Sequence, residues 1–132
     1  MRLLALILSI VFLQINLYAE VLSMENISAH IQKGLQTRLK GQNKPIIQNI
    51  YEQTGNKPLW IGGQNKTKTS HLIQALNDPL FNYKNESFDQ KSIKSLFFQL
   101  DNGEIPNQKQ AAAYAKLDLV LTSSMVRLVR FI

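Results

Sequence analysis

The residues whose chemistry could support catalysis are few in this sequence, and their spacing does not suit it. The two histidines, His30 and His71, lie far apart, and neither has an acidic or cysteine partner at the spacing of a metal site. The chain contains no cysteine, so it has no thiolate that could attack a substrate or bind a metal ion. We therefore expect no metal site and no cofactor.

The acidic residues and the serines also lack the arrangement of a catalytic site. Asp101 and Glu104 are close in sequence, but they fall at a predicted helix boundary, where capping and the helix dipole explain them. Ser123 and Ser124 lie inside a predicted helix, without the Gly-x-Ser-x-Gly turn that exposes a nucleophile. We expect no catalytic residue in this chain.

The side chains best suited to contact a ligand are two aromatics and two arginines. Tyr51 and Trp60 flank a predicted turn, where they either pack the corner between a helix and a loop or offer an aromatic face to a carbohydrate or a partner. Arg127 and Arg130 fall near one face of the predicted last helix, where they are solvated, paired with acidic residues or in contact with a partner domain. These four residues are the candidate contacts for a glycan or a protein partner.

The charge of the chain is basic but evenly spread. There are 15 lysines and arginines against 9 acidic residues among 132 residues, and the positive ones occur singly. A nucleic-acid site would cluster them and interleave aromatics, so we expect no nucleic-acid partner. For an exported protein, anionic cell-wall polymers or lipid head groups are the alternatives to a plainly solvated surface.

The N-terminus has the pattern of a secretory signal peptide. Arg2 precedes an apolar stretch from Leu3 to Leu13, and Leu17-Tyr18-Ala19 forms an A-x-A-like cleavage site. The uncharged stretch is shorter than the roughly 20 apolar residues of a membrane span. We predict a signal peptide over residues 1–19, export to the periplasm and one domain over residues 20–132. An uncleaved membrane anchor is the alternative.

The spacing of apolar residues predicts helices along the rest of the chain. A four-residue step from Ile27 to Leu39 predicts one helix that Gly41 ends. Pro45 suits the first turn of a second helix, and Gly55 suits its left-handed end.

Three further helices follow. Thr69 or Ser70 is predicted to cap a short helix that ends at Leu76, and Ser87 or Asp89 to cap the next, which Asn102-Gly103 ends. The last runs from about residue 107 to residue 132. Because no segment alternates like a strand, we predict an all-α fold, an irregular bundle of about five helices after the signal peptide.

The predicted last helix continues to Ile132 without a stop signal. Val126 to Ile132 keeps the apolar pattern and contains no glycine, asparagine or proline that would end a helix. We expect a domain truncated at its C-terminus, inside a helix.

Two segments carry short motifs, Tyr51 with Pro58-Leu59-Trp60 and Leu117 to Thr122 with Arg127. Together they resemble signatures of one family, the large YcbB-type murein L,D-transpeptidases. Tyr51, followed after a short gap by Pro58-Leu59-Trp60, resembles a motif near the start of their scaffold domain. Leu117-Asp118-Leu119-Val120-Leu121-Thr122, followed by Arg127, resembles a second motif further along that domain. The resemblance extends from about Ile46 to Ile132.

The resemblance implies an exported protein of cell-wall biogenesis. Such enzymes work in the periplasm, where they join peptidoglycan stem peptides through 3→3 cross-links. A cysteine in a Ser-His-Gly-Cys type motif attacks the donor peptide, and the catalytic domain follows a helical scaffold and a peptidoglycan-binding module. The partners implied here are therefore the downstream catalytic and peptidoglycan-binding domains, and peptidoglycan itself.

The missing cysteine separates this chain from the chemistry of that family. Without a thiolate the chain cannot form the acyl-enzyme, and it contains nothing like the Ser-His-Gly-Cys motif. We interpret the chain as an N-terminal scaffold portion that is not an enzyme on its own. The alternative is a small stand-alone periplasmic helical module that binds peptidoglycan or a protein partner.

Overall fold

A computed structural model describes residues 22–81 and 88–132 of the chain. Those residues form five α-helices and one short 3-10 turn, without a strand, so the predicted all-α class is confirmed. The elements are α2 (Met24–Thr37), α3 (Lys44–Gln53), η1 (Gly63–Asn65), α4 (Lys66–Leu76), α5 (Gln90–Asp101) and α6 (Asn107–Phe131). The signal peptide predicted over residues 1–19 lies outside the described residues.

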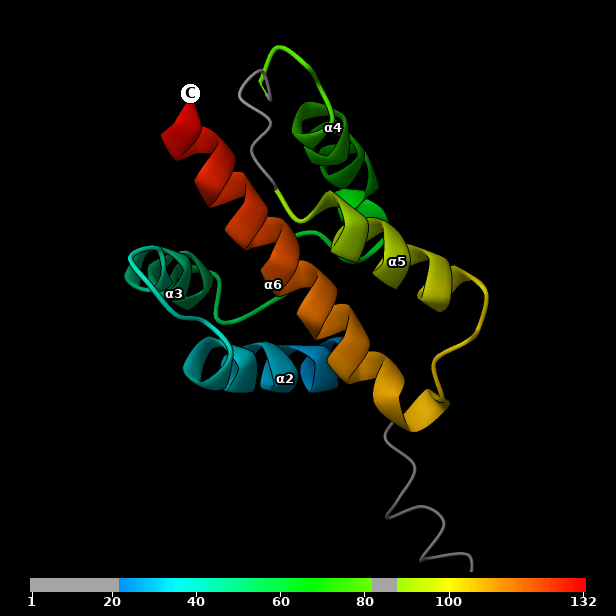
Figure 1. The fold of residues 1–132 in the computed structure, drawn as a ribbon. Coiled ribbons are helices and arrows are strands. Elements are labelled where there is room, and N and C mark those ends of the chain that lie inside the picture. The colour runs from blue at the N-terminus through cyan, green and yellow to red at the C-terminus, as the bar shows by residue number, and fades with distance from the viewer. Residues whose placement is uncertain (1–21, 82–87) are drawn as a thin grey trace, which may run out of the picture.

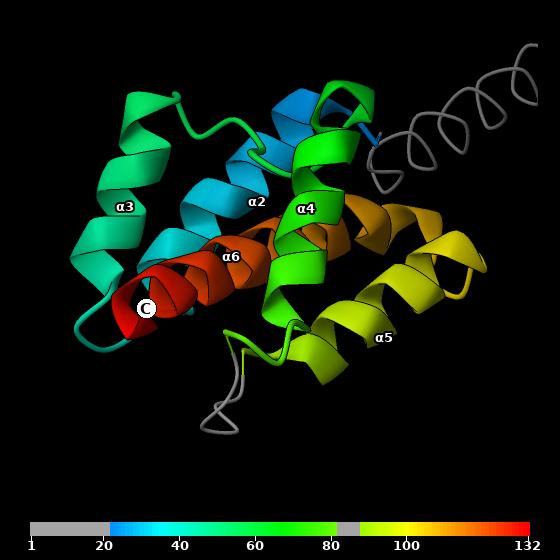
Figure 2. The same cartoon turned by 90° about the horizontal axis from the view of Figure 1, so that it is seen from above.

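The long helix α6 is the centre of the bundle. In Figure 1 it runs diagonally through the molecule, with α2 and α3 on one side and α4 and α5 on the other. In Figure 2, seen from above, α4 crosses over α6, and α5 lies on the side away from α2 and α3. The most extensive contact is between α2 and α6. Gly34 allows this close approach, because a Cβ at that position would lie 2.5 Å from the Leu119 side chain. None of the helices α2 to α6 is both long and apolar enough to cross a membrane.

The core consists of two apolar clusters, and α6 contributes to both. One cluster joins α6 to α2 and α3; its buried members are Ile27, Ile31, Leu35, Ile47, Tyr51, Ala111, Ala115, Leu119 and Val126. The other joins α6 to α4, α5 and the segment before α4; its buried members are Trp60, Leu72, Leu76, Phe88, Ile93, Leu117, Leu121 and Leu128. Because α6 is apolar on opposite sides, it is a buried central helix, not an amphipathic surface helix.

Several predicted helix ends match the structure. Pro45 stands in the first turn of α3. Gly55 and Gly103 follow α3 and α5 with φ of 65° each, the left-handed conformation expected of a glycine after a helix.

The start of α4 differs from the prediction, whereas α5 begins directly after Asp89, as predicted, but without the predicted capping hydrogen bond. Ser87, the alternative cap, lies outside the described residues. α4 begins at Lys66, so Thr69 lies inside the helix, and its hydroxyl donates to the Trp60 carbonyl (2.7 Å) instead of capping. Asp89 precedes α5 in a left-handed conformation (φ 58°), and its side chain makes no capping hydrogen bond. In both cases a tertiary contact takes the side chain that was predicted to cap the helix, since the Asp89 carboxylate pairs with Arg127.

Candidate functional site

Tyr51 and Trp60 meet two residues of α6 in a buried polar network. The Tyr51 hydroxyl donates to Asp118 Oδ2 (2.6 Å) and lies 2.7 Å from Thr122 Oγ1. The Trp60 indole Nε1–H donates to the same Thr122 oxygen (2.8 Å). Asp118 and Thr122 are one turn apart on α6, so both face this corner. We call Tyr51, Trp60, Asp118 and Thr122 the buried polar network.

The Asp118 carboxylate ties the segment after α3 to the central helix. It accepts hydrogen bonds from the backbone N–H groups of Leu59 (3.1 Å to each oxygen) and Trp60 (2.8 Å to Oδ1). Pro58 keeps this segment out of the helical conformation, which leaves these N–H groups without helical partners. The Asp118 carboxylate therefore accepts the hydrogen bonds that no helical carbonyl accepts from these two N–H groups.

Burial governs the ionisation of this network. Desolvation raises the pKa of Asp118 above its ordinary value, while hydrogen bonds from Tyr51 and from the backbone of residues 59–61 oppose that rise. Burial, followed by the nearby Asp118 charge, raises the pKa of the Tyr51 hydroxyl far above its ordinary value. The hydroxyl consequently stays protonated and remains a donor at physiological pH.

The members of the network are buried. Tyr51 and Asp118 have no exposed surface, and Trp60 is only 8% exposed. The Lys68 ammonium lies over the Trp60 ring, 5.1 Å from its centroid. Tyr51 and Trp60 thus pack a helix–loop corner, which is one of the two alternatives that the sequence left open. Tyr51 has no exposed surface for a glycan or a partner, whereas such a contact of Trp60 stays a prediction.

The sequence pattern indicated Tyr51 and Trp60 as candidate contacts, but not the residues that hydrogen-bond to them. Asp118 and Thr122 appeared only within a resemblance motif. Asp118 and Thr122 lie one helical turn apart within an apolar pattern. That spacing indicates a buried polar contact, because buried polar side chains need hydrogen-bond partners.

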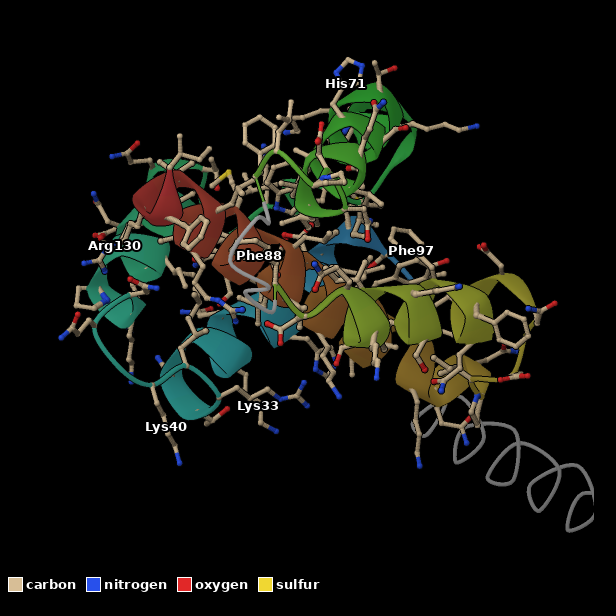
Figure 3. All side chains as sticks on the ribbon, turned by 45° about the horizontal axis from the view of Figure 1, so that its top comes forward. Lys33, Lys40, His71, Phe88, Phe97 and Arg130 are labelled. Atoms are coloured by element: carbon tan, nitrogen blue, oxygen red, sulfur yellow. The ribbon has the colours of Figure 1, made fainter. Side chains whose placement is uncertain are left out.

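Arg127 and Arg130 lie apart from this network, near the end of α6. The Arg127 guanidinium pairs with Asp89 (3.0 Å) and lies 5.9 Å from the Phe88 ring centroid, so its pairing with an acidic residue is confirmed. Arg130 Nη1 donates to Asn43 Oδ1. Figure 3 shows Arg130 and Phe88 in this part of the molecule. Contact of Arg127 or Arg130 with a glycan or a partner stays a prediction.

Metal-binding side chains do not converge in the part of the chain that is described. Within residues 22–81 and 88–132, histidine and carboxylate side chains form no group of three that could hold a metal ion.

The fold and the network together define the class of this protein. It is an all-α helical bundle in which a buried carboxylate joins an extended segment to the central helix. A family model described as Scaffold domain matches residues 45–132, and the chain belongs to this family. The comparisons with curated proteins and with solved structures gave no match.

The match coincides with the segment in which the resemblance was found. It includes α3, the extended segment with Trp60 and all of α6. The prediction of a scaffold domain is therefore confirmed, and the motifs that suggested it include all four residues of the buried polar network.

Proposed function

We propose that this chain is the scaffold portion of an exported peptidoglycan L,D-transpeptidase of the YcbB type. The observation that carries the proposal is the contact between the two sequence signatures. Tyr51 and Trp60 from the first and Asp118 and Thr122 from the second bind one another directly. Two short motifs that contact each other in the structure support the family assignment more strongly than two motifs found separately in the sequence.

The role of the scaffold in this proposal is to hold other domains, without chemistry of its own. The chain has no cysteine, and the transpeptidase reaction needs a thiolate to form its acyl-enzyme. Catalytic and peptidoglycan-binding domains would supply the nucleophile and the substrate contacts. The rigid attachment of residues 59–60 to α6 suits a domain whose task is to keep others in position.

The proposal includes a periplasmic location. Its support is the N-terminal pattern of Arg2, the apolar stretch after it and the small residue Ala19. The intact mass of the protein from an envelope fraction tests this part. A mass that begins at Glu20 is expected, whereas a mass that retains residues 1–19 contradicts cleavage and favours a membrane-tethered module.

The decisive experiment is to read the genomic DNA beyond the codon of Ile132 in all three frames. Further scaffold sequence followed by a Ser-His-Gly-Cys type motif is expected. Unrelated sequence in all frames would contradict the transpeptidase assignment and leave the stand-alone periplasmic module. Incubating the purified chain with peptidoglycan fragments adds a direct control, in which no 3→3 cross-linked product should form.

A further inference from the structure

A groove lies between the end of α6 and the loop that joins α2 to α3. Its volume is about 600 Å³, and its walls come from residues 39–43 on one side and from the last turns of α6 on the other. Figure 2 shows that loop passing the C-terminal end of α6. Phe88 and Phe131 form an apolar part of the lining. We call this feature the arginine groove.

Two guanidinium groups are held at this groove by the fold. Arg127 is fixed by Asp89 and is about one third exposed, and Arg130 is exposed and bonded to Asn43. The contact with Asp89 and the contact with Asn43 each use Nη1 of a guanidinium that carries five N–H donors, so each group has further donors to offer a ligand. Fixed guanidiniums bind carboxylates well because less side-chain entropy is lost on binding.

The charge of the groove is positive. Lys40, Arg127 and Arg130 line it, and within residues 22–81 and 88–132 no carboxylate side chain does. The Asp89 carboxylate pairs with Arg127 and offsets its charge, which leaves Lys40 and Arg130 as the remaining positive charges. Helix α3 also begins here, and the Asn43 side chain does not cap it. The positive end of the α3 dipole adds to the field of the arginines.

We propose that the arginine groove binds a free carboxylate of a peptidoglycan stem peptide. This inference rests on the proposed function for the identity of the ligand and on the groove for its chemistry. Arg130, with Arg127 beside it, would bind the carboxylate, and the apolar part of the lining would receive an aliphatic part of the peptide.

The shape and the polar groups of the groove favour a peptide over a membrane surface or a phosphate. A lipid surface is flat and needs a protruding basic patch, whereas these cations line a hollow. The amide side chains of Gln42 and Asn43 carry both donors and acceptors, which match peptide N–H and C=O groups. Phosphate oxygens would use only the donors.

The experiment measures binding of a soluble disaccharide-tetrapeptide from peptidoglycan to the purified protein by calorimetry at low salt. Arg130→Gln should weaken binding by roughly three- to tenfold, the effect of losing one charge-assisted contact at a half-open site. The matched control is Arg38→Gln, an exposed arginine outside this groove, which should change affinity by less than about twofold. The same ligand with its carboxylates converted to amides should bind weakly to the unaltered protein.

Several results would overturn the inference. These are no binding, equal losses in Arg130→Gln and Arg38→Gln, or equal binding of the amidated ligand. Tighter Arg130-dependent binding of inorganic phosphate or of anionic lipid vesicles would assign the groove to another ligand. If Arg130→Gln fails to fold, the comparison of free and amidated ligand still decides. The absence of a downstream Ser-His-Gly-Cys motif would remove the proposed function without changing these measurements.

Discussion

At the scale of single residues, Asp118 is subject to two opposing effects. Full burial disfavours its charge, while three donor groups from Tyr51, Leu59 and Trp60 favour it. Burial is the larger effect, and the pKa of Asp118 is raised. The residue that joins the extended segment to α6 therefore makes the stability of the domain sensitive to pH.

The direction of that pH dependence follows from the raised pKa. The folded chain binds the Asp118 proton more tightly than the unfolded chain, whose aspartate has the ordinary value of 3.8. The resulting stabilisation is complete below that value and is lost as the pH rises through the raised pKa. Asp118→Asn carries no charge at this position and lacks this dependence.

The test compares melting temperatures of the two proteins between about pH 4 and pH 8. The melting temperature of the unaltered chain, minus that of Asp118→Asn, should fall as the pH rises. A difference that grows with pH would mean that the hydrogen bonds to the carboxylate outweigh its burial.

The Tyr51 hydroxyl is the second residue whose contribution can be isolated. Tyr51→Phe keeps the buried ring but removes the donor to Asp118 and the contact with Thr122. We expect the free energy of unfolding to fall by about 1–2 kcal/mol, measured by urea denaturation. Tyr114→Phe on α6 removes a hydroxyl outside the network and should cost less than about 0.5 kcal/mol. If the two substitutions lower the free energy of unfolding equally, the buried polar network does not stabilise the fold as proposed.

At the scale of the elements, the start of α5 is held by its neighbours more than by its own capping. The Phe88 carbonyl accepts from the buried Ser124 hydroxyl (2.7 Å). Gln90 at the first position of α5 accepts from the Phe88 N–H (2.9 Å) and donates to the Leu76 carbonyl (3.0 Å). These contacts join α5 to the end of α4 and to the middle of α6.

Two adjacent serines provide a matched test of this junction. Ser124→Ala removes the donor to the buried Phe88 carbonyl and should lower the free energy of unfolding by about 1–2 kcal/mol. Ser123→Ala, at the half-exposed neighbouring position, should change it by less than about 0.5 kcal/mol. Denaturation curves of the two variants under one condition check the prediction. If Ser123→Ala proves the more costly of the two, the junction is wrongly assigned.

At the scale of the whole molecule, α6 contributes side chains to both core clusters, and we expect the two clusters to unfold together. Leu119 and Val126 face the cluster with α2 and α3, whereas Leu117 and Leu121 face the cluster with α4 and α5. The buried polar network spans the boundary, since Tyr51 belongs to the first cluster and Trp60 to the second. Loss of either cluster therefore removes support from the other.

A core truncation tests this coupling. Leu117→Ala deletes a fully buried side chain and should lower the free energy of unfolding by about 2–5 kcal/mol. The fluorescence of Trp60, the single tryptophan, and the helical circular dichroism should still report one shared transition. Val129→Ala, 65% exposed, is the control with little expected effect. Separate transitions by the two probes would show independent halves.

Apolar spacing predicted most of the helices, because the position of a helix depends largely on the local sequence. Pro45, Gly55 and Gly103 marked boundaries correctly, since proline and glycine act on the backbone of their own turn. The start of α4 and the capping of α5 were predicted less well. Thr69 and Asp89 bind groups that are distant in the sequence, and no local pattern reveals such partners.

The sequence by itself determined the all-α class, the scaffold resemblance and the absence of a thiolate nucleophile. These properties depend on periodicity, on short motifs and on composition, which can be read along the chain. Only the tertiary structure decided that Tyr51 and Trp60 are buried with Asp118 and Thr122, and that the arginines line a groove. The physical reason is that burial and pairing depend on which distant segments meet, and the helices meet only when the two clusters close around α6.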